Sequence, residues 1–298
     1  MTSSPFGRVL TAMVTPMSPD GAVDGAGVDA LVEHLLATGH DGVVVNGTTG
    51  EASTLTDDES VETVRRVVEV GAGRLKVVAG CGSNDTAHAV AMARRMADAG
   101  ADGLLLVSPY YNKPTQAGLV AHCRAVADAT DRPVMLYDIP GRTAVPFAHD
   151  TLVALAEHPN VVAVKDAKGD LAASTRVMAA TDLLWFSGED ALTLPLLAIG
   201  AVGTVSVVGH VTGSHYRAML EAVDRGDLAE AVRIHRALVP VVDAIMSPSQ
   251  GAIMAKAALV ELGVIEHATV RLPLVESPPE HLEALRAALA TLPTLKDA

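Results

Sequence analysis

The chain has 298 residues, of which 49% are hydrophobic and only 3% aromatic. This is enough apolar material for one large α/β domain with an aliphatic core. The net charge of −13 argues against a nucleic-acid or anionic-membrane partner, because phosphate-bearing surfaces attract basic proteins.

The two cysteines, Cys81 and Cys123, have no CxxC spacing and do not suggest a disulfide framework. The segment Met1–Gly7 lacks the basic start and apolar stretch of a signal peptide. No apolar run reaches the length of a membrane span. We therefore expect a cytoplasmic protein without a membrane partner.

Short β-rich apolar segments recur along the chain and alternate with helical patterns. Each segment has the length of a strand and ends in polar or glycine residues. The predicted strands are Val9–Thr15, Gly42–Asn46, Leu75–Gly80, Gly103–Ser108, Pro133–Tyr137, Val161–Lys165, Leu184–Ser187 and Val202–Val207.

Helical spacing of apolar residues fills the gaps between these strands. A helix around Val28–Leu36 is expected to stop at Gly39, and one around Ala89–Ala97 at Gly100. The segment Thr56–Glu59 has the pattern of a capping box. Further helices are predicted to begin near Thr115, Pro146, Leu171, Ala191 and Thr212.

Eight strand–helix units in series predict an α/β fold, a closed (β/α)8 TIM barrel, over residues 1–226. The competing architecture, an open doubly wound sheet, is disfavoured because no G-x-G-x-x-G turn follows an early strand. After Gly226 three helices are predicted without intervening strands, at Asp227–Met246, Gln250–Gly263 and Pro279–Leu292. We assign residues 227–298 to a C-terminal helical domain that packs on the barrel or on a neighbouring subunit.

Lys165 ends an otherwise apolar predicted strand, and the carboxyl ends of barrel strands carry the active site in this architecture. A buried lysine loses much of its preference for the charged form, so its neutral amine can attack a carbonyl to form an imine. The alternative interpretation is a structural lysine that pairs with Asp166.

Polar residues end the neighbouring strands as well. Tyr137 ends the strand before that of Lys165 and could relay protons, or be a buried structural tyrosine. The loop of Gly47, Thr48, Thr49 and Gly50 could hold a carboxylate through backbone N–H groups, or be an ordinary polar loop. Arg142 suits bidentate carboxylate binding, or is a solvated loop arginine.

Other chemistries find no support in the sequence. The 11 histidines are scattered without metal-ligand spacing, so no metal is expected. No Walker A loop or G-x-S-x-G elbow occurs, and no cofactor is expected.

Taken together, these motifs resemble those of the dihydrodipicolinate synthase family, within the pyruvate-dependent class I aldolase superfamily. The resemblance runs from Gly7 to the C-terminal helices. The motifs that carry it are Gly47-Thr48-Thr49-Gly50-Glu51, Tyr110-Tyr111-Asn112-Lys113-Pro114, Tyr137-Asp138-Ile139-Pro140-Gly141-Arg142-Thr143, Val164-Lys165-Asp166 and Ser187-Gly188-Glu189-Asp190.

The resemblance implies a lyase that condenses pyruvate with L-aspartate 4-semialdehyde to 4-hydroxy-tetrahydrodipicolinate, on the diaminopimelate and lysine pathway. Lys165 would form the Schiff base and Tyr137 would donate and accept the proton. Thr48 and Tyr111 would complete the relay, with Tyr111 supplied by the neighbouring subunit of a homotetramer built as a dimer of dimers.

The resemblance also implies the substrate contacts. Thr49 and the main chain at Val205 would hold pyruvate, and Arg142 would bind the carboxylate of aspartate semialdehyde. Two residues depart from the common family pattern: Asp138 stands where many members have Asn, and Ala144 where Gly is common.

Two other functions compete with this interpretation. N-acetylneuraminate lyases and sugar-acid aldolases share the lysine and the tyrosine, but sialic-acid lyases usually lack an arginine corresponding to Arg142. A catalytically silent ligand-binding barrel is the alternative outside enzymology. We further predict weak or absent feedback by lysine, because Asp57, Ser60 and His88 differ in charge and size from the usual lysine-site residues.

Overall fold

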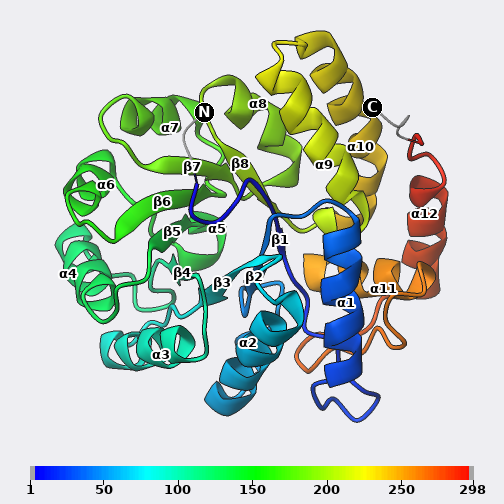
Figure 1. The fold of residues 1–298 in the computed structure, drawn as a ribbon, viewed down its shortest axis with the longest axis horizontal. Helices are drawn as coiled ribbons and strands as arrows, with labels where there is room; N and C mark the ends of the chain where they lie inside the picture. The colour runs from blue at the N-terminus through cyan, green and yellow to red at the C-terminus, as the bar shows by residue number, and fades with distance from the viewer. Residues whose placement is uncertain (1–3, 295–298) are drawn as a thin grey trace.

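The computed structural model describes residues 4–294, and its centre is a closed parallel barrel (Figure 1). The strands are β1 (Val9–Ala12), β2 (Gly42–Val45), β3 (Lys76–Gly80), β4 (Gly103–Val107), β5 (Val134–Asp138), β6 (Val161–Asp166), β7 (Leu184–Ser187) and β8 (Gly203–Ser206). Each strand pairs with the next, and β8 pairs with β1 to close the ring. The predicted TIM barrel is confirmed.

A ring of helices surrounds the strands (Figure 1). They are α1 (Gly25–Ala37), α2 (Asp57–Gly71), α3 (Thr86–Asp98), α4 (Gln116–Ala127), α5 (Pro140–Thr143), α6 (His149–Ala156), α7 (Leu171–Met178), the 3-10 helix η1 (Asp190–Leu192), α8 (Thr193–Ala198) and α9 (Gly209–Asp224).

Local sequence signals determine several helix ends. The Thr56 hydroxyl accepts from the Glu59 N–H while the Glu59 carboxylate accepts from the Thr56 N–H, so the predicted capping box at the start of α2 is present. Gly39 and Gly100 follow α1 and α3 with φ of 85° and 96°, a backbone conformation that favours glycine.

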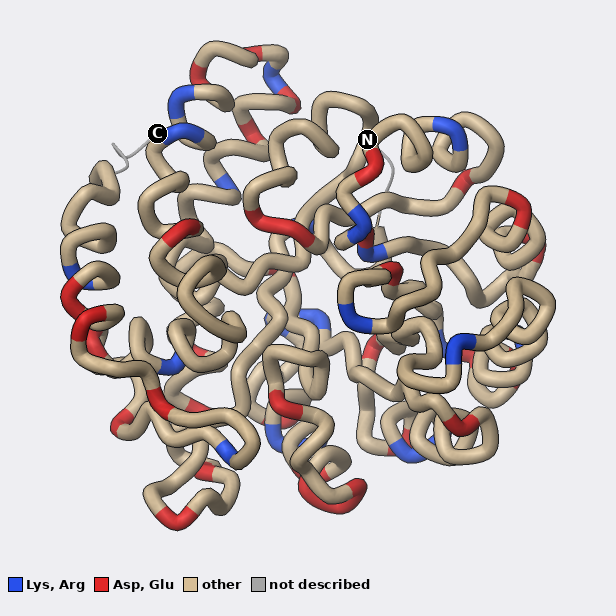
Figure 2. The backbone as a smooth tube through the Cα atoms, turned by 180° about the vertical axis from the view of Figure 1, so that it is seen from behind, with Lys and Arg blue, Asp and Glu red and all other residues tan. Residues whose placement is uncertain are grey.

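The core has two layers. Val, Leu, Ala and Met side chains fill the space between strands and helices. A second cluster fills the barrel interior, where Phe6 contacts Phe186 edge to face at 6.3 Å between ring centroids. Lys, Arg, Asp and Glu are spread over the surrounding helices and loops, with both signs interspersed (Figure 2).

Three helices follow the barrel, as predicted: α10 (Leu228–Met246), α11 (Gly251–Glu261) and α12 (Pro279–Leu289). Helix α10 packs against α9 and α12, and α11 also contacts α9, so this C-terminal helical region lies against the barrel (Figure 1). The division of the chain at residue 226 stays a prediction, and the ends of the two ranges, 1–3 and 295–298, lie outside the described residues.

Within residues 4–294 no single helix combines the length and hydropathy needed to cross a bilayer; only α10 and α11 together, bent by 111°, would satisfy length and composition.

Candidate active site

Lys165 and Tyr137 lie side by side at the carboxyl end of the barrel. They are register partners on β6 and β5, and both side chains are about 95% buried, at 4% and 5% exposure. The Lys165 Nζ lies over the Tyr137 ring, 4.2 Å from its centroid. The amine and the phenol therefore occupy one enclosed space, as the sequence predicted for two neighbouring strand ends.

The alternative pairing of Lys165 with Asp166 does not occur. Adjacent strand residues point to opposite faces, and Asp166 faces outward. Its Oδ2 accepts hydrogen bonds from Ser174 Oγ (2.5 Å) and Trp185 Nε1 (2.9 Å). Among the described residues, Lys165 has no carboxylate within ion-pair distance.

Burial changes the titration of both groups. Desolvation lowers the pKa of Lys165 to about 8, against the charge of Asp190, which raises it. Desolvation also raises the pKa of Tyr137 to about 12, while the nearby Arg142 charge and the Thr48 side chain lower it. Near neutral pH the site therefore holds an amine that deprotonates readily and a protonated phenol.

Gly188 directly follows β7, and because it has no side chain, the Lys165 side chain can pack against it. A Cβ atom at this position would lie 2.8 Å from Lys165 Cγ and 3.0 Å from Cε. Real Cβ atoms do not approach other carbons this closely, so a side chain here would displace the lysine.

The Gly47–Glu51 loop after β2 contributes two threonines with different surroundings. Thr49 is buried with 7% exposure, whereas Thr48 is exposed and borders a cavity. The loop folds on itself through hydrogen bonds from the N–H of Gly50 to the Gly47 carbonyl and from the N–H of Glu51 to the Thr48 carbonyl.

A cavity of about 310 Å³ opens at this end of the barrel and brings together Thr48, Tyr137 and Arg142. Arg142 stands on the short helix α5 and is exposed at the opening. The cavity extends past Tyr110 towards His88, whose Nε2 lies 3.0 Å from Asp57 Oδ1. Its volume suits a small molecule.

Val205, on β8, is fully buried and pairs with Leu10 of β1. The end of this strand is held by Asp190, whose Oδ2 accepts from the N–H groups of Val207 (3.0 Å) and Val208 (3.2 Å). Its Oδ1 accepts from the hydroxyls of Ser206 and Tyr216. The sequence showed the Ser187–Asp190 motif, but nothing in the sequence revealed these hydrogen-bond partners of Asp190.

Tyr111 does not reach this site within its own chain. Its side chain is 88% exposed, and its backbone has a φ of 74°, which is rare for a bulky residue. The neighbouring Tyr110 is also partly exposed, at 41%. The structure thus leaves Tyr111 projecting from the protomer.

The two departures from the family pattern have structural consequences. Asp138 accepts from the Phe147 N–H (3.3 Å) and pairs with Lys168 (3.3 Å) outside the barrel, so it takes no part in the cavity. Ala144 has a φ of 66°, the left-handed conformation that glycine adopts without strain.

No group of three or more His, Cys, Asp or Glu residues within residues 4–294 is placed to hold a metal ion. The polar side chains that line the cavity include hydroxyls, the Arg142 guanidinium, the Asp57 carboxylate and the His88 ring, and the Lys165 amine lies next to the lining residue Tyr137.

Comparison with known proteins identifies relatives of this barrel. The sequence profile of the Dihydrodipicolinate synthetase family matches residues 5–292. A 4-hydroxy-tetrahydrodipicolinate synthase of Kineococcus radiotolerans is 53% identical over 96% of this chain and 93% of its own.

Solved structures agree with the sequence comparison. Dihydrodipicolinate synthase of Bacillus anthracis has a TM-score of 0.93 and 41% identity over 97% of this chain and 99% of its own. The enzyme of Cyanidioschyzon merolae, solved with lysine bound, has a TM-score of 0.94 and 43% identity over the same shares.

The closed barrel and these relatives define the class: the protein is a lyase of the Schiff-base-forming, class I aldolase type. The chain belongs to the dihydrodipicolinate synthetase family. The activity predicted from the sequence, that of a 4-hydroxy-tetrahydrodipicolinate synthase in lysine and diaminopimelate biosynthesis, is confirmed by these relatives.

Proposed function

We propose that the chain condenses pyruvate with L-aspartate 4-semialdehyde through an imine on Lys165. The observation that carries this proposal is the Lys165 amine, buried over the Tyr137 ring with a pKa lowered to about 8. A neutral amine attacks the keto carbon of pyruvate, and loss of water gives the imine. The imine then loses a methyl proton to become an enamine, whose carbon attacks the aldehyde.

The protons of these steps need a donor and an acceptor inside the cavity. The Tyr137 ring lies under the Lys165 amine, and the raised pKa of its phenol keeps it protonated and able to donate. Thr48, which also lines the cavity, connects Tyr137 to the opening. We assign Tyr111 as the third member of this relay.

Two carboxylates have to be bound. Thr49 and the main chain at Val205 are assigned to pyruvate, since both lie buried near the strand ends. Arg142 is assigned to aspartate semialdehyde, since its guanidinium lies at the opening of the cavity that Tyr137 lines.

The test of the imine is trapping with pyruvate and borohydride, followed by peptide mass analysis. A reduced pyruvyl group is expected on the peptide that contains Lys165, and Lys165→Arg should abolish it. Lys168→Arg is the matched control, because Lys168 lies three residues away but pairs with Asp138. An adduct that survives Lys165→Arg would refute the assignment.

The second substrate is tested by turnover of pyruvate with aspartate semialdehyde, N-acetylmannosamine and sugar aldehydes. Arg142→Ala is expected to raise the KM for aspartate semialdehyde about 10- to 100-fold, because it removes a charge-assisted carboxylate contact. Pyruvate trapping should be retained. Unchanged use of aspartate semialdehyde in this variant would show that Arg142 has another role.

We also propose a homotetramer, a dimer of dimers, in which Tyr111 enters the neighbour's cavity. Its exposure and its rare backbone conformation support an intersubunit role. Tyr111→Ala and Lys165→Ala should each be inactive alone, whereas mixed oligomers refolded from both should regain part of the activity. No recovery in verified mixed oligomers would contradict a shared site.

Weak lysine feedback is proposed as well. An imidazole is never anionic near neutral pH, so His88 cannot pair with an α-ammonium group, and the Asp57 carboxylate that lines the same cavity is already in contact with the His88 ring. Titration with L-lysine should leave the activity nearly unchanged, and strong inhibition at sub-millimolar lysine would contradict the proposal of weak feedback.

For the chain as a whole we propose residues 1–226 as the catalytic barrel and 227–298 as a helical domain attached to it. We also propose a cytoplasmic location, which is supported by two free, buried cysteines.

A further inference from the structure

The Gly47–Glu51 loop is held from outside the barrel, by the C-terminal helical region. Glu51 is 3% exposed, and its Oε1 lies 2.5 Å from Nζ of Lys256 on α11. Its Oε2 accepts from the backbone N–H of Arg271 at 2.9 Å. A buried carboxylate is stable only when it is paired, so these two donors fix where Glu51 can lie.

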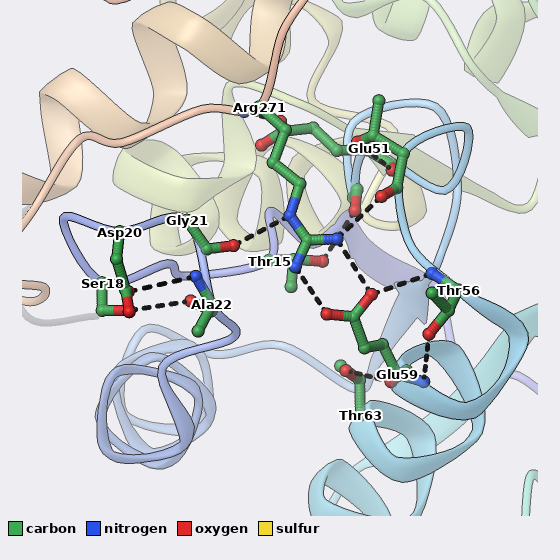
Figure 3. A network of polar contacts seen from close by, with 12 residues as sticks. Thr15, Ser18, Asp20, Gly21, Ala22, Glu51, Thr56, Glu59, Thr63 and Arg271 are labelled. Atoms are coloured by element: carbon green, nitrogen blue, oxygen red, sulfur yellow. Dashed lines mark hydrogen bonds and ion pairs between the residues drawn. The ribbon is translucent and has the colours of Figure 1, made fainter.

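The Arg271 N–H is itself held in place by the Arg271 side chain (Figure 3). Its guanidinium forms a bidentate pair with Glu59, at 2.5 and 2.9 Å, on helix α2. It also donates to the carbonyls of Thr54 (2.7 Å) and Gly21 (2.8 Å). One side chain therefore joins the C-terminal segment to two loops and a helix of the barrel.

Lys256 has a comparable double role. Its side chain is fully buried, and Nζ donates to the Thr269 carbonyl (2.7 Å) as well as to Glu51. The amine thus connects α11, the Thr269–Arg271 segment and the Gly47–Glu51 loop.

The Gly47–Glu51 loop contains an unfavourable backbone conformation that its surroundings have to stabilise. Glu51 has a φ of 58°, the left-handed region that non-glycine residues seldom adopt without help from their surroundings. Two further contacts hold the same loop: Thr15 Oγ1 donates to the Gly50 carbonyl (2.7 Å), and Gln250, which caps α11, donates to the Thr48 carbonyl (3.3 Å).

We propose that Lys256 and Arg271 are positioning residues, which act through Glu51 to set the Gly47–Glu51 loop and thereby the affinity for pyruvate. The inference rests on the proposed role of Thr49 in holding pyruvate. It gives the C-terminal helical region a part in pyruvate binding through the position of the Gly47–Glu51 loop.

The test compares steady-state constants for both substrates. Arg271→Ala is expected to raise the KM for pyruvate by about 10-fold or more, since small displacements of a binding group are costly in a preorganised site. The KM for aspartate semialdehyde, which depends on Arg142, should stay within about twofold. Borohydride trapping at low pyruvate should slow in proportion.

Arg286→Ala is the matched control. Arg286 forms a bidentate pair with Glu261 in the same C-terminal region, at 2.7 Å for both contacts, but does not touch the loop. Its loss should leave both KM values within about twofold, because exposed ion pairs contribute little. Glu59→Gln is the second variant if Arg271→Ala does not fold: it keeps a side chain able to complete the capping box but weakens the anchor of Arg271.

Thr49→Val distinguishes a failure of the proposed role of Thr49 in binding pyruvate from a failure of the positioning role of Arg271. If it leaves the KM for pyruvate unchanged, the proposed role of Thr49 is wrong. If it raises that KM while Arg271→Ala and Glu59→Gln behave like Arg286→Ala, the positioning role is wrong. A lowered melting temperature with an unchanged KM in Arg271→Ala or Glu59→Gln would equally overturn it, because the contacts would then serve only stability.

Discussion

At Lys165, burial and the neighbouring carboxylates act in opposite directions on the pKa of the amine, and the Arg142 charge acts in the same direction as burial. Removal from water favours the neutral form, whereas Asp190 and Glu189 favour the cation. The net result, a pKa of about 8, leaves a sizeable neutral fraction near neutral pH. A solvated lysine would have almost none.

This balance predicts the pH dependence of imine formation. Because only the neutral amine attacks pyruvate, the rate of trapping with cyanoborohydride should rise with pH, reach half its plateau near pH 8 and level off above it. A midpoint near 10.5, the ordinary pKa of a solvated lysine, would contradict the proposed effect of burial.

The space around Lys165 can be tested through Gly188. Gly188→Ala should displace the lysine and slow trapping by about 10-fold or more, because the new Cβ would clash with Cγ and Cε. Gly118→Ala is the control, since its Cβ would meet other atoms only at 3.5 Å. Equal trapping rates in the two variants would show that Gly188 is not required for space.

At the scale of elements, Asp190 joins three of them. Asp190 lies on η1, and its carboxylate accepts a hydrogen bond from the N–H of Val207, which directly follows β8. The hydroxyl of Tyr216 on α9 donates to the same carboxylate. Because its carboxylate lies close enough to influence Lys165, the same residue links the stability of the β8 end to the titration of the amine.

Asp190→Asn should therefore change two measurements. The free energy of unfolding in urea is expected to fall by about 2–3 kcal/mol, since an amide cannot accept from all of these donors. The pH midpoint of trapping should move below that of the wild type, because the charge that raises the Lys165 pKa is gone. A midpoint that stays constant would exclude Asp190 as an electrostatic partner.

At the scale of the whole molecule, buried histidines make the barrel sensitive to acid. His40 Nδ1 donates to the Leu35 carbonyl, and its Nε2 lies 2.7 Å from the Thr11 hydroxyl oxygen. His210 Nδ1 donates to the Val207 carbonyl, and its Nε2 accepts from the Val14 N–H. Burial lowers the pKa of His40 to about 4 and that of His210 to about 3.

Their contribution to stability is complete above the unfolded pKa of 6.5 and is lost as pH falls towards these folded values, because the unfolded chain binds protons first. At pH 5 the loss is about 2 kcal/mol for each histidine. The free energy of unfolding in urea at pH 7.5, 6 and 5 measures this loss. Unchanged stability between pH 7.5 and 5 would contradict the histidine contribution.

Glu59, with a pKa lowered to about 2, adds a separate loss of stability below pH 4.5.

The sequence alone determined the order of elements, because strand and helix periodicity are local properties. All eight predicted strands form, although the first ends at Ala12 and not at Thr15, and the short helix α5 at Pro140–Thr143 was not predicted. The placement of Lys165 beside Tyr137 followed from their positions at the ends of consecutive barrel strands.

Only the tertiary structure decided which charged groups meet. Glu51 pairs with Lys256 and with the backbone of Arg271, more than 200 residues away along the chain. Asp190 likewise finds partners on β8 and α9. The Glu51 contacts depend on how the C-terminal helical region packs on the barrel, and the Asp190 contacts on how the barrel closes. No spacing in the sequence predicts either arrangement. The residues that we assign to the reaction could thus be chosen from the sequence, whereas the charged partners of Glu51 and Asp190 could not.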